Sequence, residues 1–256
     1  MQRQFELYRM YKKGKDVVSN GITWVAHKLG QVENPQWAAS VIPPNGPRLM
    51  KQLFDIHGYE IFEVGAFNAD PHPGNIMYNP ASDTISLIDY GQLIEVPEEY
   101  REHFARLIIA IETGDVKTCQ RAWKKLNQKF FWKETKEYDP PDIVYAVASM
   151  HFGGSAGMLK GLKQFGFSSL ADAMGPAMAE KINIIDADPR YGMIQRMGFC
   201  LNGVGMNLGT GGMSQAKLLR GSAERFLKKR ALKATYEDDE VKSSDCCGGC
   251  GGGCAC

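Results

Sequence analysis

Two acidic residues and an asparagine give this sequence its strongest chemical signal. Asp70 stands five positions before Asn75, and Asp89 opens an Asp-Tyr-Gly segment after a short apolar stretch. Phosphoryl transfer needs a residue that orients the acceptor oxygen and oxygen ligands that hold magnesium against the phosphates. In the kinase pattern, an Asp, an Asn and a second Asp before Gly fill these roles in this order. We therefore predict Asp70 as the catalytic residue, and Asn75 and Asp89 as ligands of Mg2+ and, through it, of the cofactor ATP.

The residues around these side chains predict how they are held. The loop between Asp70 and Asn75 contains two prolines and a glycine, which exclude a helix and stiffen the loop. Strand-like segments follow at 76–78 and 84–88, joined by a turn-forming composition. A small hairpin of this kind carries Asn75 at one end and Asp89 at the other. It brings the two predicted metal ligands toward each other.

Residues 67–92 resemble a known family. The string N-A-D-P-H-P-G-N-I followed by L-I-D-Y-G-Q resembles the atypical kinase-like UbiB family, also called the aarF-domain-containing or ADCK kinases. The resemblance covers residues 48–235 and corresponds to the C-terminal lobe only. It implies an α+β, mostly α, fold: a protein-kinase-like helical lobe with a small β-hairpin that carries the metal ligands. It also implies Mg2+- and ATP-dependent phosphoryl transfer or ATP hydrolysis that supports ubiquinone or other isoprenoid lipid metabolism.

Two residues of the motif depart from the wider kinase pattern. Asn68 stands where protein kinases usually carry His, and Tyr90 replaces the Phe of D-F-G. Both departures, Asn68 and Tyr90, are compatible with the family that the sequence resembles. His72 lies inside the motif, and we favour for it a structural hydrogen bond that fixes the loop over a catalytic role. A purely structural alternative, in which Asp70 and Asp89 only cap turns, is disfavoured by the length of the matching string.

A complete kinase fold also needs a lobe that binds the nucleotide. Such a lobe has a phosphate loop, a Lys that pairs the phosphates and a Glu that pairs the Lys. The resemblance adds a K-x-G-Q motif and an alanine-rich loop, and neither string occurs in these 256 residues. Lys28 mimics the strand Lys, but it lies too close to Asp70 for the intervening elements; we expect a solvated residue. The sequence thus predicts a fragment that lacks the N-lobe and that binds ATP poorly unless an N-lobe is supplied.

Two other functions stay open. The first is a catalytically inactive paralogue that acts as a module for binding lipid, metal or a partner enzyme. The second is a small-molecule kinase similar to the aminoglycoside phosphotransferases, because that group shares an H-P-G-N-style loop. Whether the chain is an enzyme is therefore undecided from the sequence.

Composition narrows the partners. The chain is 44% hydrophobic and 23% charged, as in ordinary globular proteins. Its 30 basic and 29 acidic residues give a net charge of +1, which argues against nucleic-acid binding. No apolar run approaches the roughly 20 residues that span a bilayer, and the first residues match neither a transit peptide nor a secretory signal. A mitochondrial or plastid, membrane-peripheral location is implied by the family resemblance alone.

The sequence divides into three parts: an N-terminal helical and linker segment, 1–47; the kinase-like lobe, 48–235; and a disordered tail, 236–256, acidic and then rich in Cys and Gly. The glycine-rich stretch from Gly153 to Gly166 is expected to be loop and short helix. Apolar periodicity and capping residues predict the other helices. These run from Val17 to Leu29, Arg48 to Val64, Pro97 to Thr113, Asp115 to Leu126, Pro140 to Met150 and Tyr191 to Leu208, and onward from Ser214.

The last helix and the tail suggest further partners. The helix over 214–233 has one basic face, which can contact anionic lipid or simply face solvent. Lipid, a membrane surface and lipid-biosynthesis enzymes are therefore candidate partners. The five cysteines of the tail leave three interpretations open: a soft metal-binding tail, a lipidated end similar to C-x-C prenylation signals, or low-complexity drift.

Overall fold

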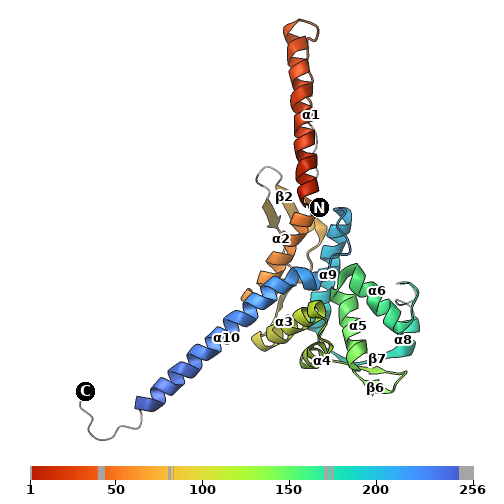
Figure 1. Cartoon of the computed structure of the whole chain (residues 1–256), viewed down its shortest axis with the longest axis vertical. Coiled ribbons are helices and arrows are strands. Elements are labelled where there is room, and N and C mark those ends of the chain that lie inside the picture. Colours follow the sequence, from red (N-terminus) through yellow and green to blue (C-terminus); the bar gives the residue numbers. More distant parts are fainter. Residues whose placement is uncertain are drawn as a thin grey trace, which may run out of the picture.

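The computed structural model describes residues 2–39, 44–79, 82, 84–169, 173 and 176–247. A body of packed helices and short sheets lies between two long helices that project from it (Figure 1). The helices are α1 (Gln2–Lys28), α2 (Gly46–Tyr59), α3 (Glu98–Thr113), α4 (Val116–Lys125), α5 (Pro141–Phe152), α6 (Gly154–Phe165), α8 (Pro176–Lys181), α9 (Pro189–Asn207) and α10 (Gln215–Cys247), with a π-helix η1 (Glu60–Val64) and a 3₁₀ turn η2 (Pro73–Asn75).

The strands within the described residues form small antiparallel sheets. One pair is β1 with β4, another is β2 with β3, and a third sheet has the order β6-β5-β7. The strand bounds are β1 (Ala66–Asn68), β2 (Ile76–Asn79), β3 (Thr84–Leu87), β4 (Leu93–Glu95), β5 (Gln128–Trp132), β6 (Glu137–Tyr138) and β7 (Ile182–Ala187). The mostly helical α+β class is thus as predicted, and it is compatible with a kinase-like fold.

The helix before the catalytic loop forms as the sequence indicates. The Asn45 side chain accepts a hydrogen bond from the backbone N–H of Arg48, and a proline occupies the first turn of α2. The helix continues into η1 and ends at Gly65, whose φ of 83° lies in the left-handed region that glycine adopts without strain. This turn places the chain in β1, where the motif begins.

The predicted hairpin is confirmed as β2 and β3, with Ile76 opposite Leu87. The sequence did not indicate the flanking pair, in which Phe67 of β1 lies opposite Ile94 of β4. This second pair brings the start and the end of the motif together. The segment between β1 and β4 in sequence, which contains the hairpin and the loop from Asp70 to Asn75, is therefore closed at its base by the pairing of these two strands.

The helices that follow largely match the predictions. Gly114 ends α3 with a φ of 76°, and the Asp115 side chain caps α4 by accepting from the N–H of Thr118 at 3.0 Å. The glycine-rich stretch after α5 was expected to be loop and short helix, but it forms one regular helix, α6. A Cβ at Gly161 would lie 2.0 Å from Met150 Cγ, and a Cβ at Gly157 would lie 2.1 Å from a carbonyl oxygen of α5. These glycines allow α6 to pack closely against α5.

The sheet β6-β5-β7 was not predicted. Its central strand pairs residues that are distant in sequence, with Trp132 opposite Ile182 and Gln128 opposite Ala187. Neither segment shows a strict alternation of apolar and polar residues. In β5, Phe130, Phe131 and Trp132 are consecutive, and in β7 the apolar Ile184 is 71% exposed. Only the tertiary pairing identifies these segments as strands.

Aromatic rings connect the helices of the body. Phe62 of η1 stacks on Phe104 of α3 at 5.8 Å, and Phe104 meets Phe152 of α5 edge to face at 5.6 Å. Phe152 in turn contacts Tyr191 of α9 at 5.6 Å. Each such buried ring stabilises the fold by roughly 1.5–3 kcal/mol through apolar burial. The core therefore fixes η1, which leads into the motif, against α9.

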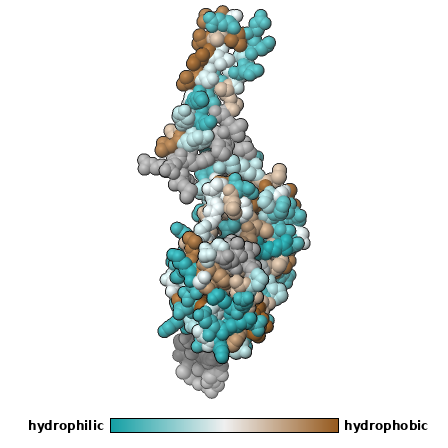
Figure 2. Space-filling model, turned by 90° about the vertical axis from the view of Figure 1, so that its right-hand side faces the viewer, coloured by the Kyte–Doolittle hydropathy of each residue, from teal (hydrophilic) through white to brown (hydrophobic). Residues whose placement is uncertain are grey.

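The projecting helices differ from the sequence expectation. α1 spans Gln2–Lys28, whereas a helix was expected only from Val17. Apolar side chains are exposed along it, among them Val17 at 72% and Ile22 at 66% (Figure 2). At the other end, disorder was expected from residue 236, whereas α10 continues to Cys247; the predicted tail beyond it lies outside the described residues. Within the described part of the chain, no helix combines the length and apolarity needed to span a membrane.

Candidate active site

Asn75 and Asp89 meet at the open end of the hairpin. The amide nitrogen Nδ2 of Asn75 lies 3.4 Å from Oδ2 of Asp89, and the N–H of Ile88 donates to the carbonyl of Asn75 at 3.1 Å. The second carboxylate oxygen, Oδ1 of Asp89, accepts from the N–H of Gly91 at 2.8 Å. The predicted convergence of these two side chains is therefore what the structure shows.

His72 shapes the loop between Asp70 and Asn75. Its Nδ1 accepts from the N–H of Gly74 at 3.1 Å, which starts the 3₁₀ turn η2. Its backbone N–H donates to the carbonyl of Asp70 at 2.7 Å, and its carbonyl accepts from the N–H of Asn75 at 2.8 Å. The hydrogen bond expected of His72, which fixes the loop, is therefore present.

Asn68 connects the loop that begins at Asp70 to the Asp-Tyr-Gly segment. It is 2% exposed, its Nδ2 donates to the carbonyl of Asp89 at 2.7 Å, and its Oδ1 accepts from the N–H of Asp70 at 3.0 Å. An amide supplies the donor and the acceptor at once. This explains an Asn at the position where protein kinases usually carry His, because one side chain fixes the backbone at both acidic residues.

Glu60 lies beneath this connection. Its carboxylate accepts from the Tyr90 hydroxyl at 2.9 Å and from the N–H of Asn68 at 3.3 Å. Burial raises the pKa of Glu60, and these two hydrogen bonds oppose that rise. Burial, together with the hydrogen bond and the charge of Glu60, raises the pKa of Tyr90 to about 12. The Tyr of Asp-Tyr-Gly therefore anchors its segment to η1.

His57 completes the buried layer. Its Nδ1 lies 3.7 Å from Oε2 of Glu60, and its side chain is fully buried. Burial lowers the pKa of His57 to about 4. The imidazole is therefore neutral near pH 7, and its contact with Glu60 is not an ion pair at that pH.

Arg196 reaches the site from α9. Its Nη2 lies 3.3 Å from Oδ2 of Asp70, and its Nη1 donates to Oε1 of Gln92 at 3.0 Å. The Asp70 side chain is about a third exposed, at 34%. No motif in the sequence points to Arg196, because only the packing of α9 against the catalytic loop brings the two residues together.

The donor set suits a hard cation. Asp89 offers Oδ2, and the Asn75 amide can turn its oxygen toward the same point. Among the described residues there is no group of three or more His, Cys, Asp and Glu that could hold a metal ion by themselves. Mg2+ does not need one, since it takes few protein ligands and completes its shell with water and phosphate oxygens. These residues therefore fit a Mg2+ ion bound together with a phosphate group.

Lys28 and the basic residues of α10, which the sequence suggested as candidates, make contacts with groups other than the predicted site residues. Lys28 ends α1, which projects from the body (Figure 1), and its Nζ lies 6.0 Å from the Trp24 ring; the solvated interpretation is confirmed. On α10, three basic side chains bind carboxylates of this chain. The pairs are Arg220 with Glu224 at 2.6 Å, Lys229 with Glu63 at 2.8 Å, and Arg230 with Glu98 and Glu102.

Comparison with known proteins finds similarity over the part of the chain that contains these residues. Residues 42–123 match the ABC1 atypical kinase-like domain. The ABC1 family protein lscO of Purpureocillium lilacinum is 32% identical over 108 residues, which are 39% of this chain and 18% of that protein. The chloroplastic protein ACTIVITY OF BC1 COMPLEX KINASE 3 of Arabidopsis thaliana is 25% identical over 147 residues, 57% of this chain and 19% of that protein. The mitochondrial atypical kinase COQ8B of Danio rerio is 31% identical over 67 residues, 26% of this chain and 11% of that protein.

The matches cover less than a fifth of the length of each of these three relatives. The matched range nevertheless contains Asp70, Asn75 and Asp89, together with α2, α3 and most of α4. The resemblance read from residues 67–92 is thereby confirmed. Over residues 42–123, the chain is thus similar to the ABC1 atypical kinase-like domain and to proteins of the UbiB, or aarF-domain-containing, family.

Proposed function

We propose that this chain supplies the metal-holding and acceptor-orienting half of a phosphoryl-transfer site that uses Mg2+ and ATP. Asn75 and Asp89 would hold the cation, and Asp70 would accept the proton of the acceptor hydroxyl or of a water molecule. The observation that carries the proposal is the 3.4 Å contact between the Asn75 amide and the Asp89 carboxylate.

The neighbouring residues have supporting roles in this proposal. Asn68 fixes the backbone at Asp70 and Asp89, and Arg196 holds the Asp70 carboxylate from α9. When bound, Mg2+ would offset the negative charge of the phosphates. The chain's own task is to present oxygen ligands and a proton acceptor in a fixed arrangement, and the hydrogen bonds beneath the loop serve that task.

Tight binding of the ATP phosphates requires further groups, such as a phosphate loop and a Lys that pairs the phosphates. Of the basic side chains in the described part of the chain, Arg196 contacts the predicted site, where it pairs with Asp70. We therefore expect weak ATP binding by this chain, with tight binding only when an N-lobe carrying a phosphate-binding Lys is supplied.

The biological setting belongs to the proposal as well. Relatives are named as chloroplastic and mitochondrial proteins, and the UbiB resemblance suggests a role in ubiquinone or other isoprenoid lipid metabolism within such an organelle. The family match favours this type over an aminoglycoside-phosphotransferase-like kinase. Lipid contact through the basic helix would have to use side chains other than Lys229 and Arg230, which bind carboxylates of this chain.

Calorimetric titration with Mg-ATP tests the proposal. The wild-type chain should bind weakly, and Asp89→Asn should weaken binding further because one oxygen ligand loses its charge. Asp142→Asn, at an exposed carboxylate in the first turn of α5, is the matched control and should bind like wild type. Equal binding by wild type and Asp89→Asn would overturn the proposed site. Low-micromolar binding that Asp89→Asn abolishes would show that this chain grips the phosphates by itself, against our expectation.

A further inference from the structure

A cavity lies in the helical lobe, apart from the predicted phosphoryl-transfer residues. Its volume is about 350 Å³, and its walls come from α4, β5, α5, α8, β7 and the start of α9. Ligand pockets in proteins begin at about this size. None of its lining residues belongs to the predicted phosphoryl-transfer site.

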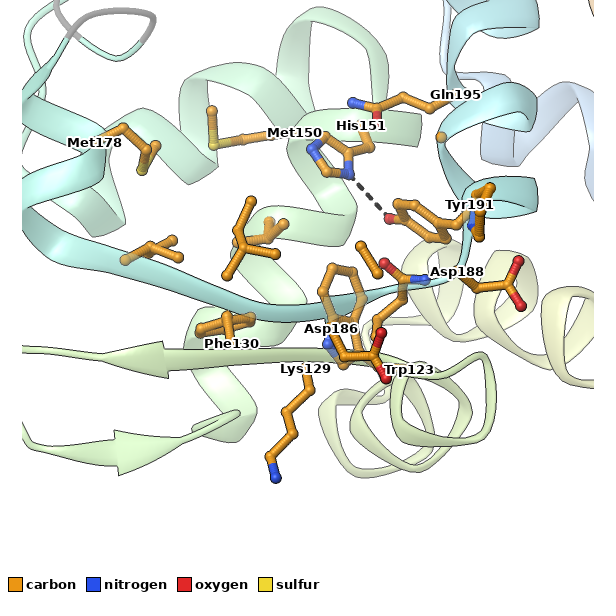
Figure 3. A pocket seen from close by; sticks show the side chains of 17 residues that line it. Trp123, Lys129, Phe130, Met150, His151, Met178, Asp186, Asp188, Tyr191 and Gln195 are labelled. Atoms are coloured by element: carbon orange, nitrogen blue, oxygen red, sulfur yellow. Dashed lines mark hydrogen bonds between the residues drawn. The ribbon is translucent and has the colours of Figure 1, made fainter.

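The walls of this cavity are mainly apolar. Phe130, Val147 and Ile182 supply branched and aromatic surface, and the flexible thioethers of Met150 and Met178 lie on the same side of β7 (Figure 3). Methionine side chains adapt to irregular ligands because they are unbranched and polarisable. These walls favour an apolar ligand of moderate size.

One hydrogen-bonded pair interrupts the apolar lining. Nδ1 of His151 lies 2.9 Å from the hydroxyl of Tyr191, and the two side chains point toward each other in Figure 3. Burial lowers the pKa of His151 to about 4 and raises the pKa of Tyr191 well above its ordinary value. Both groups are therefore uncharged near pH 7. His151 keeps a second ring nitrogen, Nε2, which this hydrogen bond does not use.

Three charged residues line the cavity, and two of them, Asp188 and Lys129, are engaged with other groups; the third, Asp186, adds a negative charge to the wall. Asp188 is paired with Arg190 at 2.6 Å. Lys129 lies over the Tyr138 ring at 4.8 Å and points away from His151 and Met150 in Figure 3. A phosphate or carboxylate would therefore find little to offset its charge in this cavity.

We propose that the cavity between α5, β7 and α9 binds an uncharged, mainly apolar small molecule with one hydrogen-bonding group, which His151 recognises. This site is separate from the phosphoryl-transfer residues and does not depend on their function. The apolar walls would provide affinity, and the neutral imidazole would orient the ligand.

The test uses N-phenyl-1-naphthylamine, an uncharged aromatic amine with one N–H group whose fluorescence rises in apolar surroundings. Gly192 is an exposed lining residue, and a Cβ there meets open space. Gly192→Phe should lower the affinity for the probe at least tenfold by occupying the mouth of the cavity. Gly203→Phe, on the same helix, where a Cβ also meets open space, is the control and should bind like wild type.

Val147→Phe narrows the cavity from α5 and serves as a second variant should Gly192→Phe fail to fold. It should also reduce probe binding at least tenfold. The anionic probe 1-anilinonaphthalene-8-sulfonate should bind the wild-type cavity at least tenfold more weakly than the neutral probe. The proposal is overturned if the folded cavity variants bind the neutral probe like Gly203→Phe, or if both probes compete for the cavity with equal affinity.

Discussion

Arg196 of α9 holds its guanidinium nitrogen Nη2 3.3 Å from Oδ2 of Asp70, although the two residues lie far apart in the sequence. The same guanidinium binds Gln92, directly after the Asp-Tyr-Gly segment. One side chain from the helical lobe thus contacts both parts of the motif. The loop between Asp70 and Asn75 is held by its own hydrogen bonds and also by the contact with Arg196 of α9.

Removal of Arg196 should strengthen divalent-cation binding by the free site. Arg196→Ala deletes a positive charge beside Asp70, so the affinity for Mn2+ without nucleotide should rise about fivefold, on the order of 1 kcal/mol for a partly exposed charge. Mn2+ titration followed by electron paramagnetic resonance measures this. Arg106→Ala, which removes a cation paired with Glu102 within α3, is the control. Equal effects of the two variants would show that Arg196 exerts no local influence on the site.

The Tyr90 hydroxyl should stabilise the fold through Glu60. Tyr90→Phe removes the 2.9 Å hydrogen bond and leaves a partly buried carboxylate with one fewer donor. We expect a loss of about 1 kcal/mol in the free energy of unfolding, which lowers Tm by about 2–4 °C in a chain of this size. Tyr138→Phe, at an exposed tyrosine of β6, should leave Tm unchanged. If both variants melt like wild type, the hydrogen bond from Tyr90 to Glu60 does not contribute to the stability of the fold.

Buried His57 should make stability depend on pH. Its pKa is about 4 in the folded chain, below its ordinary value of 6.5. Between these values the unfolded chain binds a proton that the folded chain does not. The contribution to stability is therefore complete above pH 6.5 and is lost as the pH falls toward 4, by a total of roughly 3 kcal/mol. Burial gives His151 the same direction, whereas the raised pKa of Glu60 acts in the opposite direction.

Urea unfolding at pH 7 and pH 5 of wild type and His57→Gln measures this contribution. The stability of the variant should change less between the two pH values, because Gln does not titrate. His103→Gln, in α3, is the control and should keep the wild-type dependence. A wild-type pH dependence in His57→Gln would mean that His57 is not the group responsible.

Gly114 should be required at the end of α3 for its backbone conformation alone. Its φ is 76°, and a Cβ there would meet no atom within 4 Å. Gly114→Ala should therefore cost about 1 kcal/mol through the left-handed backbone. Gly203→Ala, in the interior of α9 and equally free of clashes, should instead stabilise the protein by about 0.5–1 kcal/mol. Thermal unfolding of the two variants gives the sign of each effect, and the same sign in both would contradict the assignment.

Local signals predicted the parts of the structure that local chemistry determines. The turn composition after Tyr78 gave the hairpin, and Asp115 and Gly114 marked the helix boundaries, because caps and turns act over a few residues. The pairing of β5 with β7 and the approach of Arg196 to Asp70 were not predicted. Both depend on contacts between segments distant in sequence, for which a single chain carries no local pattern.

The glycines of α6 are a second case in which contacts with another segment determine the local structure. Glycine usually disfavours helices, so the stretch after Gly153 was expected to be loop and short helix. Gly157 and Gly161 instead let α6 approach α5, and the closeness of that packing outweighs the cost in helix propensity. Sequence identifies the residue type, but its role depends on which neighbour lies against it.

The most direct test of the central claim locates the cation. Mn2+ replaces Mg2+ at such sites and broadens the amide signals of nearby residues in nuclear magnetic resonance spectra, even when binding is weak. With ATP present, broadening should centre on residues 70–75 and 88–91, should disappear in Asp89→Asn, and should persist in Asp142→Asn. Broadening that centres elsewhere, or that survives unchanged in Asp89→Asn, would contradict a metal site formed by Asn75 and Asp89 beside Asp70.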